Sequence, residues 1–337
     1  MLANLTPYLE AEVIKSSLVL VVAAFWDYLI GDPLFLLHPV QVMGWLISRY
    51  TNLSFRLLQK PWQQRFSGII LGLSLIIGSG IGAWFLIKLA CTINFWFGLT
   101  VEISLLASCF AAKSLSQAAK SVLNHLAGND IKSARSQLSM YVGRDTANLS
   151  RSEILRAVLE TVGENAVDGI TAPLFYAIFG VSLGIGAVPL ALGYKAASTL
   201  DSMVGYLRHP YIDIGWFSAQ LEDRLTWLPC RLTVLTLAVF SGRPLTVLEI
   251  CRRDAVLDPS PNSGWSECVY AAVLGVQLGG TNTYQGKTRV KPLLGNSDRE
   301  ISPEIIYEAL SLTRYCFLLW LLISILSLLI LNYPLNK

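Results

Sequence analysis

The feature that most constrains this chain is a series of apolar blocks separated by polar sequence. The blocks cover residues 18–30, 68–87, 95–112, 174–194, 228–240 and 315–331. A helix needs about 20 residues to cross a hydrocarbon layer, and backbone amides in lipid must be satisfied within their own segment. We therefore predict an all-α, polytopic membrane protein with about 4–6 membrane segments. Helical connecting segments would join them within a single domain over residues 1–337.

Composition and charge exclude several other classes of protein. The chain is 53% hydrophobic and only 15% charged, whereas a soluble domain is about 25% charged. A net charge of +3 is too small to indicate nucleic-acid binding. The six cysteines form no CxxC pair, so neither a disulfide framework nor a zinc site is expected.

The distribution of basic residues predicts the topology. Segment 31–67 carries four basic residues against one acid, and segment 113–172 carries seven basic residues, whereas segment 88–94 carries one. Basic residues favour the cytoplasmic side, so the long polar segments, including 241–314, are expected in the cytoplasm. The prediction is a multi-pass protein of the cell (inner) membrane, in contact with membrane lipid, whose site faces the cytoplasm.

The block at 174–194 leaves two topologies open. If it crosses the membrane once, the polar segment 195–227 lies outside, although that segment resembles its cytoplasmic neighbours. Gly184, Gly186 and Pro189 permit a broken or re-entrant helix that returns to the same side. A single cytoplasmic site requires the second form.

Four polar segments carry candidate chemistry, and the first follows the first apolar block. It contains Gly31-Asp32-Pro33 and His38-Pro39-Val40. Asp32 either caps a helix that Pro33 begins, or it binds a metal. His38 either packs or caps, or it binds phosphate or moves a proton.

The second segment predicts a helix with an acidic row. The pattern Ser150-Arg151-Ser152-Glu153 is a capping box, which starts a helix. Three carboxylates then recur every four residues on one predicted face, at Glu160, Glu164 and Asp168. The row is either a solvated face or a metal site, since Mg²⁺ often takes one or two carboxylates together with substrate phosphate.

The third and fourth segments are dense in polar groups and glycine. The third, over 194–229, places hydroxyls, acids and a lysine near the end of an apolar block. This segment is either a solvated loop or part of a functional site. The fourth ends with Gly280 and Gly286-Lys287-Thr288, but five residues separate the two glycines, so a standard P-loop is excluded. These glycines either bring backbone close to a phosphate or simply make turns.

In chain order, the four segments resemble the membrane-bound adenosylcobinamide-phosphate synthase family of cobalamin biosynthesis. The resemblance covers residues 27–286. It is carried by the stretches GDP…HPV, GRDT, ETVGENAVDGITAPLF, STLDSMVGY, DIGW…LED and SPNSGW…GVQLGGTNTYQG. The chain departs from the family pattern at Gly163, Ser198 and Thr226, where the family usually has Ala, Asn and Asn.

The resemblance implies a carbon–nitrogen ligase that uses ATP and Mg²⁺. It would join the corrinoid adenosylcobyric acid to (R)-1-amino-2-propanol phosphate, or to aminopropanol, through an acyl phosphate. Later cobalamin-assembly enzymes would be its partners. A transporter and a non-catalytic membrane scaffold for corrinoid assembly are the alternatives.

Site residues carried over from the resemblance fall into three groups. The catalytic residues are His38, Asp145 and Asp223. The substrate- and phosphate-binding residues are Arg144, Asn165, Lys195, Thr199, Tyr206 and Asn262. The metal ligands are Asp32, Glu164, Asp168 and Asp201.

Overall fold

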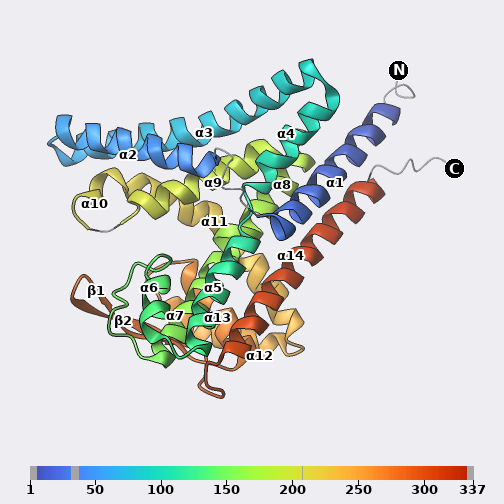
Figure 1. Cartoon of the computed structure of the whole chain (residues 1–337). Coiled ribbons are helices and arrows are strands. Elements are labelled where there is room, and N and C mark those ends of the chain that lie inside the picture. Colours follow the sequence, from blue (N-terminus) through green and yellow to red (C-terminus); the bar gives the residue numbers. More distant parts are fainter. Residues whose placement is uncertain (1–5, 32–37, 207, 332–337) are drawn as a thin grey trace. The chain divides into compact units, whose positions relative to one another are not determined.

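The computed structural model describes residues 6–31, 38–206 and 208–331, and these residues are mostly helical (Figure 1). The prediction of a mostly helical chain is therefore confirmed. In chain order the elements are α1 (Thr6–Leu29), α2 (Pro39–Leu57), α3 (Pro61–Ile93), α4 (Phe95–Ala107), α5 (Ala112–Ala127), α6 (Ile131–Leu138), α7 (Arg151–Ala166), a π-helical turn (Val167–Thr171), α8 (Ala172–Ser182), α9 (Ala187–Val204), α10 (Tyr211–Ile214), α11 (Trp216–Phe240), α12 (Pro244–Asp254), a 3-10 turn (Ala255–Leu257), α13 (Ser263–Leu274), β1 (Leu278–Tyr284), β2 (Lys287–Leu294) and α14 (Pro303–Leu331).

The chain forms two compact units that are interleaved in sequence. Unit 1 consists of Met1–Ala111, Ala172–Leu225 and Leu318–Lys337. Unit 2 consists of Ala112–Thr171 and Thr226–Phe317. The single domain over 1–337 stays a prediction, and each unit is described by itself below.

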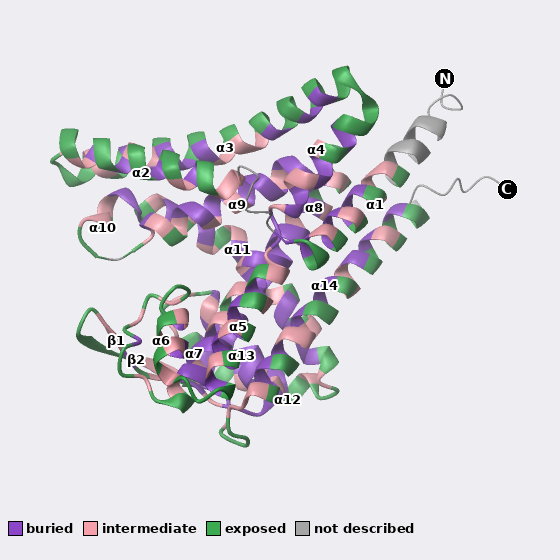
Figure 2. Ribbon diagram, viewed as in Figure 1, coloured by how far each residue is buried: buried purple, intermediate pink, exposed green. Residues whose placement is uncertain are grey.

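Unit 1 holds the 33-residue helix α3, which packs on α2, α4, α9 and α10 (Figure 1). Among the described residues, two helical stretches, Pro61–Ile93 and Pro303–Ile330, are long and apolar enough to cross a membrane. A third exists if α4 and α5 together count as one span. Large apolar side chains such as Ile81 and Phe85 are exposed on α3, and contiguous apolar surface of this kind marks a membrane or partner contact (Figure 2). The predicted number of membrane segments, about 4–6, stays a prediction.

The apolar block at 174–194 is broken, as the second of the two predicted topologies requires. Helix α8 ends at Ser182, inside the block, and α9 begins at Ala187. Gly184 and Gly186 have φ of +70° and +94°, a region that glycine adopts without strain. The amides of Ile185 and Gly186 donate to the carbonyl of Gly180 at 3.0 and 3.1 Å and close the turn before α9.

Unit 2 is built around α7 and α13, which Figure 2 shows to be largely buried. The predicted capping box is confirmed, because the Ser150 amide donates to Glu153 Oε2 at 2.7 Å and the Glu153 amide donates to Ser150 Oγ at 3.3 Å. Gly163 lets the two helices approach closely: a Cβ at this position would lie 3.3 Å from the Cα of Glu267.

The all-α prediction is wrong at residues 278–294, where β1 and β2 form an antiparallel hairpin. Tyr284 pairs with Lys287, so Gln285 and Gly286 form a two-residue turn. Both have positive φ, 52° and 74°, which is the geometry of a type I′ hairpin turn. Gly286 therefore makes a turn, which agrees with the exclusion of a P-loop.

The regular α-helix predicted for the row of three carboxylates does not extend to its third member. Helix α7 ends at Ala166, and Asp168 lies in the π-helical turn Val167–Thr171. A π turn changes the spacing of side chains around the helix, so the spacing of a regular α-helix does not apply at Asp168. Turns of this kind occur frequently at functional sites.

Candidate functional site

A buried cluster of charges lies where β1 meets α7. Glu160, whose side chain is 2% exposed, forms an ion pair with Nη2 of Arg144. Its Oε1 accepts a hydrogen bond from the Gly279 amide at 2.9 Å. Arg144 Nη1 donates to Asn282 Oδ1 at 2.9 Å. Arg144, which the resemblance assigns to phosphate, thus has both terminal nitrogens on protein groups.

A second buried carboxylate, Glu267, lies on α13. It is 0% exposed, and Lys291 Nζ on β2 donates to its Oε1 at 3.1 Å. Burial raises the pKa of Glu267 to about 8; Lys291 opposes this shift, whereas the charges of Glu164 and Glu160 add to it. Burial lowers the pKa of Lys291, but these carboxylates outweigh burial and raise it, so the ammonium stays charged.

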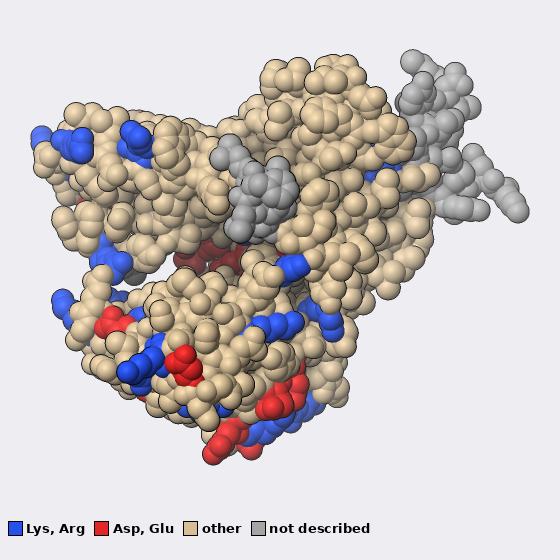
Figure 3. Space-filling view, viewed as in Figure 1, with Lys and Arg blue, Asp and Glu red and all other residues tan. Residues whose placement is uncertain are grey.

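Charged side chains are concentrated in this unit. In the view of Figure 3, most visible acidic and basic side chains lie on unit 2, whereas the visible surface of α4 is tan. A polar unit of this kind suits polar substrates such as phosphates.

Asp145 lies beside the hairpin turn. Its Oδ1 accepts from the Gln285 amide at 3.0 Å and its Oδ2 accepts from the Gly286 amide at 2.8 Å. Its own amide donates to the Thr283 carbonyl at 2.8 Å. This geometry ties the motif around Arg144 to the last motif of the chain, 140 residues later in sequence.

Replacing Asp145 with alanine is expected to loosen the hairpin. Hydrogen bonds to a charged acceptor contribute about 1.5–3 kcal/mol, so the amides of Gln285 and Gly286 should exchange with solvent much faster. Asp145→Asn, which keeps one acceptor oxygen, should have a smaller effect. Hydrogen exchange followed by mass spectrometry measures both. Unchanged exchange together with lost activity would instead favour the catalytic role predicted for Asp145.

The other predicted residues of unit 2 make local contacts. Asn165 Nδ2 donates to the Thr161 carbonyl at 2.9 Å, one turn earlier on α7. Asn262 is buried at the start of α13, and its amide donates to Ser260 Oγ at 3.3 Å. Glu164 is exposed and Asp168 is half-buried.

In unit 1, α9 carries three predicted residues. Thr199 Oγ1 donates to the Lys195 carbonyl at 2.7 Å. Asp201 is close to Gly205, where an added Cβ would lie 1.9 Å from its Oδ1. After the helix, the Tyr206 hydroxyl donates to the Ser202 carbonyl at 2.7 Å.

The remaining predicted residues of unit 1 lie on other elements. His38 caps α2, since its Nδ1 accepts from the Val40 amide at 3.3 Å and Pro39 begins the helix. Asp223 lies on α11, and burial raises its pKa. Asp32 lies outside the described residues.

The structure thus brings Arg144, Asp145, Glu164, Asp168, Asn165 and Asn262 into unit 2, and His38, Lys195, Thr199, Asp201, Tyr206 and Asp223 into unit 1. In the described ranges, no group of three His, Cys, Asp or Glu side chains could hold a metal ion by itself. A metal would therefore need further ligands from substrate or water.

Sequence reasoning missed four polar side chains of unit 2 that the contacts single out. They are Arg156, Glu267, Asn282 and Lys291. Arg156 Nη2 donates to the Thr281 carbonyl at 3.1 Å and to Asn282 Oδ1 at 3.2 Å. No local pattern marks these residues, because it is the hairpin folding against α7 and α13 that brings them together.

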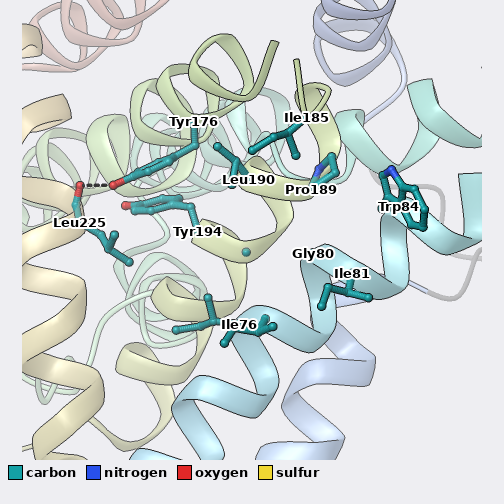
Figure 4. Close-up of a pocket in the computed structure, with 12 residues that line it drawn as sticks. Ile76, Gly80, Ile81, Trp84, Tyr176, Ile185, Pro189, Leu190, Tyr194 and Leu225 are labelled. Carbon is teal, nitrogen blue, oxygen red and sulfur yellow. Dashed lines mark hydrogen bonds between the residues drawn. The ribbon is translucent and has the colours of Figure 1, made fainter. Parts of the chain in front are cut away.

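Unit 1 also contains an apolar cavity of about 380 Å³ (Figure 4). Tyr176 and Tyr194 stack there with ring centroids 4.9 Å apart, and the Tyr176 hydroxyl donates to the Leu225 carbonyl at 2.9 Å. The lining comes from α3, α8, α9, α11 and the turn between α8 and α9. It comprises Ile76, Ile77, Gly80, Ile81, Trp84, Tyr176, Ile185, Pro189, Leu190, Gly193, Tyr194 and Leu225. It contains no charged side chain, so the cavity does not suit a phosphate.

Comparison with known proteins matches most of this chain. Residues 20–313 match the family described as "CobD/Cbib protein". The chain is 50% identical to a cobalamin biosynthesis protein CobD of Synechocystis sp. over 323 residues, which cover 96% of this chain and 93% of that protein. It is 40% identical to a cobalamin biosynthesis protein CbiB of Salmonella typhimurium over 291 residues, 85% of this chain and 89% of that protein. No solved structure matches.

Proposed function

Because this chain belongs to the CobD/CbiB family, whose named relatives are cobalamin biosynthesis proteins, we propose that it is an ATP-dependent ligase of that pathway. The reaction would form an amide between adenosylcobyric acid and (R)-1-amino-2-propanol phosphate, or free aminopropanol. The observation that carries the proposal is the cluster of unit 2, in which Glu160, Glu267 and Lys291 are held by α7, α13 and the hairpin.

The proposed chemistry needs polar groups of this kind. A carboxylate is a poor electrophile, so transfer of a phosphoryl group from ATP would give an acyl phosphate that the amine attacks, with phosphate leaving. Catalysis of such steps comes mostly from positioning and from charge stabilisation on the phosphates. Cations such as Lys291 would stabilise the phosphate charges, and a carboxylate would accept the proton of the amine.

The residues of unit 2 fit a magnesium ion that is bound together with phosphate. Mg²⁺ prefers oxygen ligands and usually takes one or two carboxylates together with substrate phosphates and water. Glu164 is exposed on α7, and Asp168 is half-buried in the adjacent π turn. When bound, the ion would neutralise phosphate charge. In unit 1, His38 and Asp223 would be catalytic residues. Lys195 would bind phosphate and Asp201 would be a metal ligand.

We further propose a multi-pass location in the cell membrane with the polar segments in the cytoplasm. The two or three helices that are apolar and long enough to span support the membrane location. The broken pair α8 and α9 supports the same proposal, because a re-entrant pair would return the chain to the cytoplasmic side without a full crossing.

A direct assay tests the ligase proposal. The purified full-length chain in detergent would be incubated with ATP, Mg²⁺, adenosylcobyric acid and either amine. We expect a new amide by mass spectrometry, together with ATP-dependent release of phosphate. The broken pair α8 and α9 also suits a transporter, and uptake of corrinoid into sealed vesicles without new product would support that function instead. Binding of other corrinoid enzymes with neither result would indicate a scaffold.

Two substitutions test the proposed metal ligands. Asp168→Asn and Asp201→Asn should each lower the rate of amide formation by about tenfold or more, because loss of a charged ligand weakens metal binding. Asp298→Asn, an exposed acid of unit 2, serves as the control and should leave the rate unchanged. If both variants amidate at the wild-type rate, neither residue is a metal ligand.

A further inference from the structure

Glu267 buries a carboxylate oxygen that accepts no hydrogen bond from the residues that the structure describes. Its Oε1 accepts from Lys291, but its Oε2 is buried and unsatisfied. Buried polar atoms are nearly always paired, so an exception calls for an explanation such as a bound ion. Glu267 was not among the residues that the sequence assigned to a metal.

Charges of both signs surround Glu267. Glu164 and Glu160 both act on its carboxylate through their charge. Arg144 and Arg156 both lie within ion-pair distance of Glu160, and Lys291 pairs with Glu267. Among the described residues Glu164 forms no ion pair, so its charge near Glu267 favours a further cation.

Glu164 lies on α7 beside the place where this helix packs on α13. Glu164 follows Gly163, whose contact with the Cα of Glu267 sets the close approach of α7 and α13. Glu164 is exposed, so solvent reaches the pair from that side. Among the residues described, the Glu164 side chain makes no hydrogen bond, so both of its oxygens can serve as ligands.

We propose that Glu267 and Glu164 bind one divalent cation of the Mg²⁺ class beside Lys291. Both side chains offer carboxylate oxygens, which Mg²⁺ and Mn²⁺ prefer, and water would complete the coordination. The cation binds without nucleotide, and only its use with ATP rests on the proposed function.

Manganese provides the probe. The full-length chain in detergent, freed of metal with EDTA, would be titrated with Mn²⁺ while free Mn²⁺ is followed by electron paramagnetic resonance. We expect one Mn²⁺ per chain that Mg²⁺ displaces. Glu267→Gln and Glu164→Gln should each weaken binding by about tenfold or more. Glu249→Gln, an exposed glutamate on α12, is the matched control and should bind as the wild type does.

The two variants keep the proposal falsifiable. Because Glu164 is exposed, Glu164→Gln is expected to keep the fold even if Glu267→Gln disturbs it, and circular dichroism checks both. The proposal is wrong if Glu164→Gln binds Mn²⁺ like the wild type, or if the wild type binds none at about 1 mM. If Mn²⁺ binds as expected but no amide forms, the ligase proposal is wrong and the cation site is supported. If amide forms but Mn²⁺ binding does not depend on Glu164, the cation site is wrong and the ligase proposal is supported.

Discussion

Replacing Glu160 with alanine is expected to destabilise unit 2 by about 3–5 kcal/mol, because it leaves a buried arginine without its partner. The side chain of Arg144 is only 7% exposed and pairs with Glu160. The Gly279 amide, which donates to the same carboxylate, would also lose its acceptor. Urea unfolding of the detergent-solubilised chain, followed by hydrogen exchange in unit 2, measures the loss.

Helix α7 offers a matched control for this prediction. Glu164 lies one turn after Glu160 but is exposed, so Glu164→Ala in EDTA should change stability by no more than about 0.5 kcal/mol. The double variant Arg144→Leu with Glu160→Leu removes both charges and should recover much of the loss. Equal stability of the Glu160 and Glu164 variants would show that the buried ion pair does not stabilise unit 2.

Replacing Gly68 with alanine is expected to destabilise unit 1 by about 1–3 kcal/mol through overpacking. A Cβ at Gly68 would lie 2.0 Å from the carbonyl oxygen of Ile214, so backbone would have to move where α3 meets α10. Gly78 on the same helix has nothing within 4 Å of such a Cβ.

At Gly78 the expected change in stability on replacement with alanine therefore has the opposite sign. Alanine is favoured over glycine inside a helix by about 0.8–1 kcal/mol, so Gly78→Ala should be neutral or stabilising. Thermal unfolding of both variants in one detergent gives the comparison. A Gly68→Ala variant as stable as Gly78→Ala would mean that α3 and α10 do not pack as closely as described.

The parts of the fold that local sequence determines could be predicted. Apolar blocks predicted helices, and Gly184, Gly186 and Pro189 made the break between α8 and α9 one of two predicted topologies. Ser150 and Glu153 marked the start of α7, since a capping box involves only neighbouring residues. Helix capping by His38 was one of its two predicted roles.

Contacts between distant residues could not be predicted in this way. Arg144 and Asn282 are 138 residues apart, and Glu267 meets Lys291 only after the hairpin has formed. The four-residue spacing of the acids assumed a regular α-helix, so it missed the π turn at Asp168. The order of motifs indicated the family, whereas individual roles depend on this long-range packing.

The turn of the β1–β2 hairpin bears on how the chain tolerates insertions. Gln285 and Gly286 are exposed, and an exposed two-residue loop tip is usually a good place for an epitope tag or an added segment. Here the amides of both turn residues donate to one distant side chain, Asp145. The length of this loop is therefore fixed from outside the hairpin, and relatives that lengthen it would have to change the residue at position 145 as well.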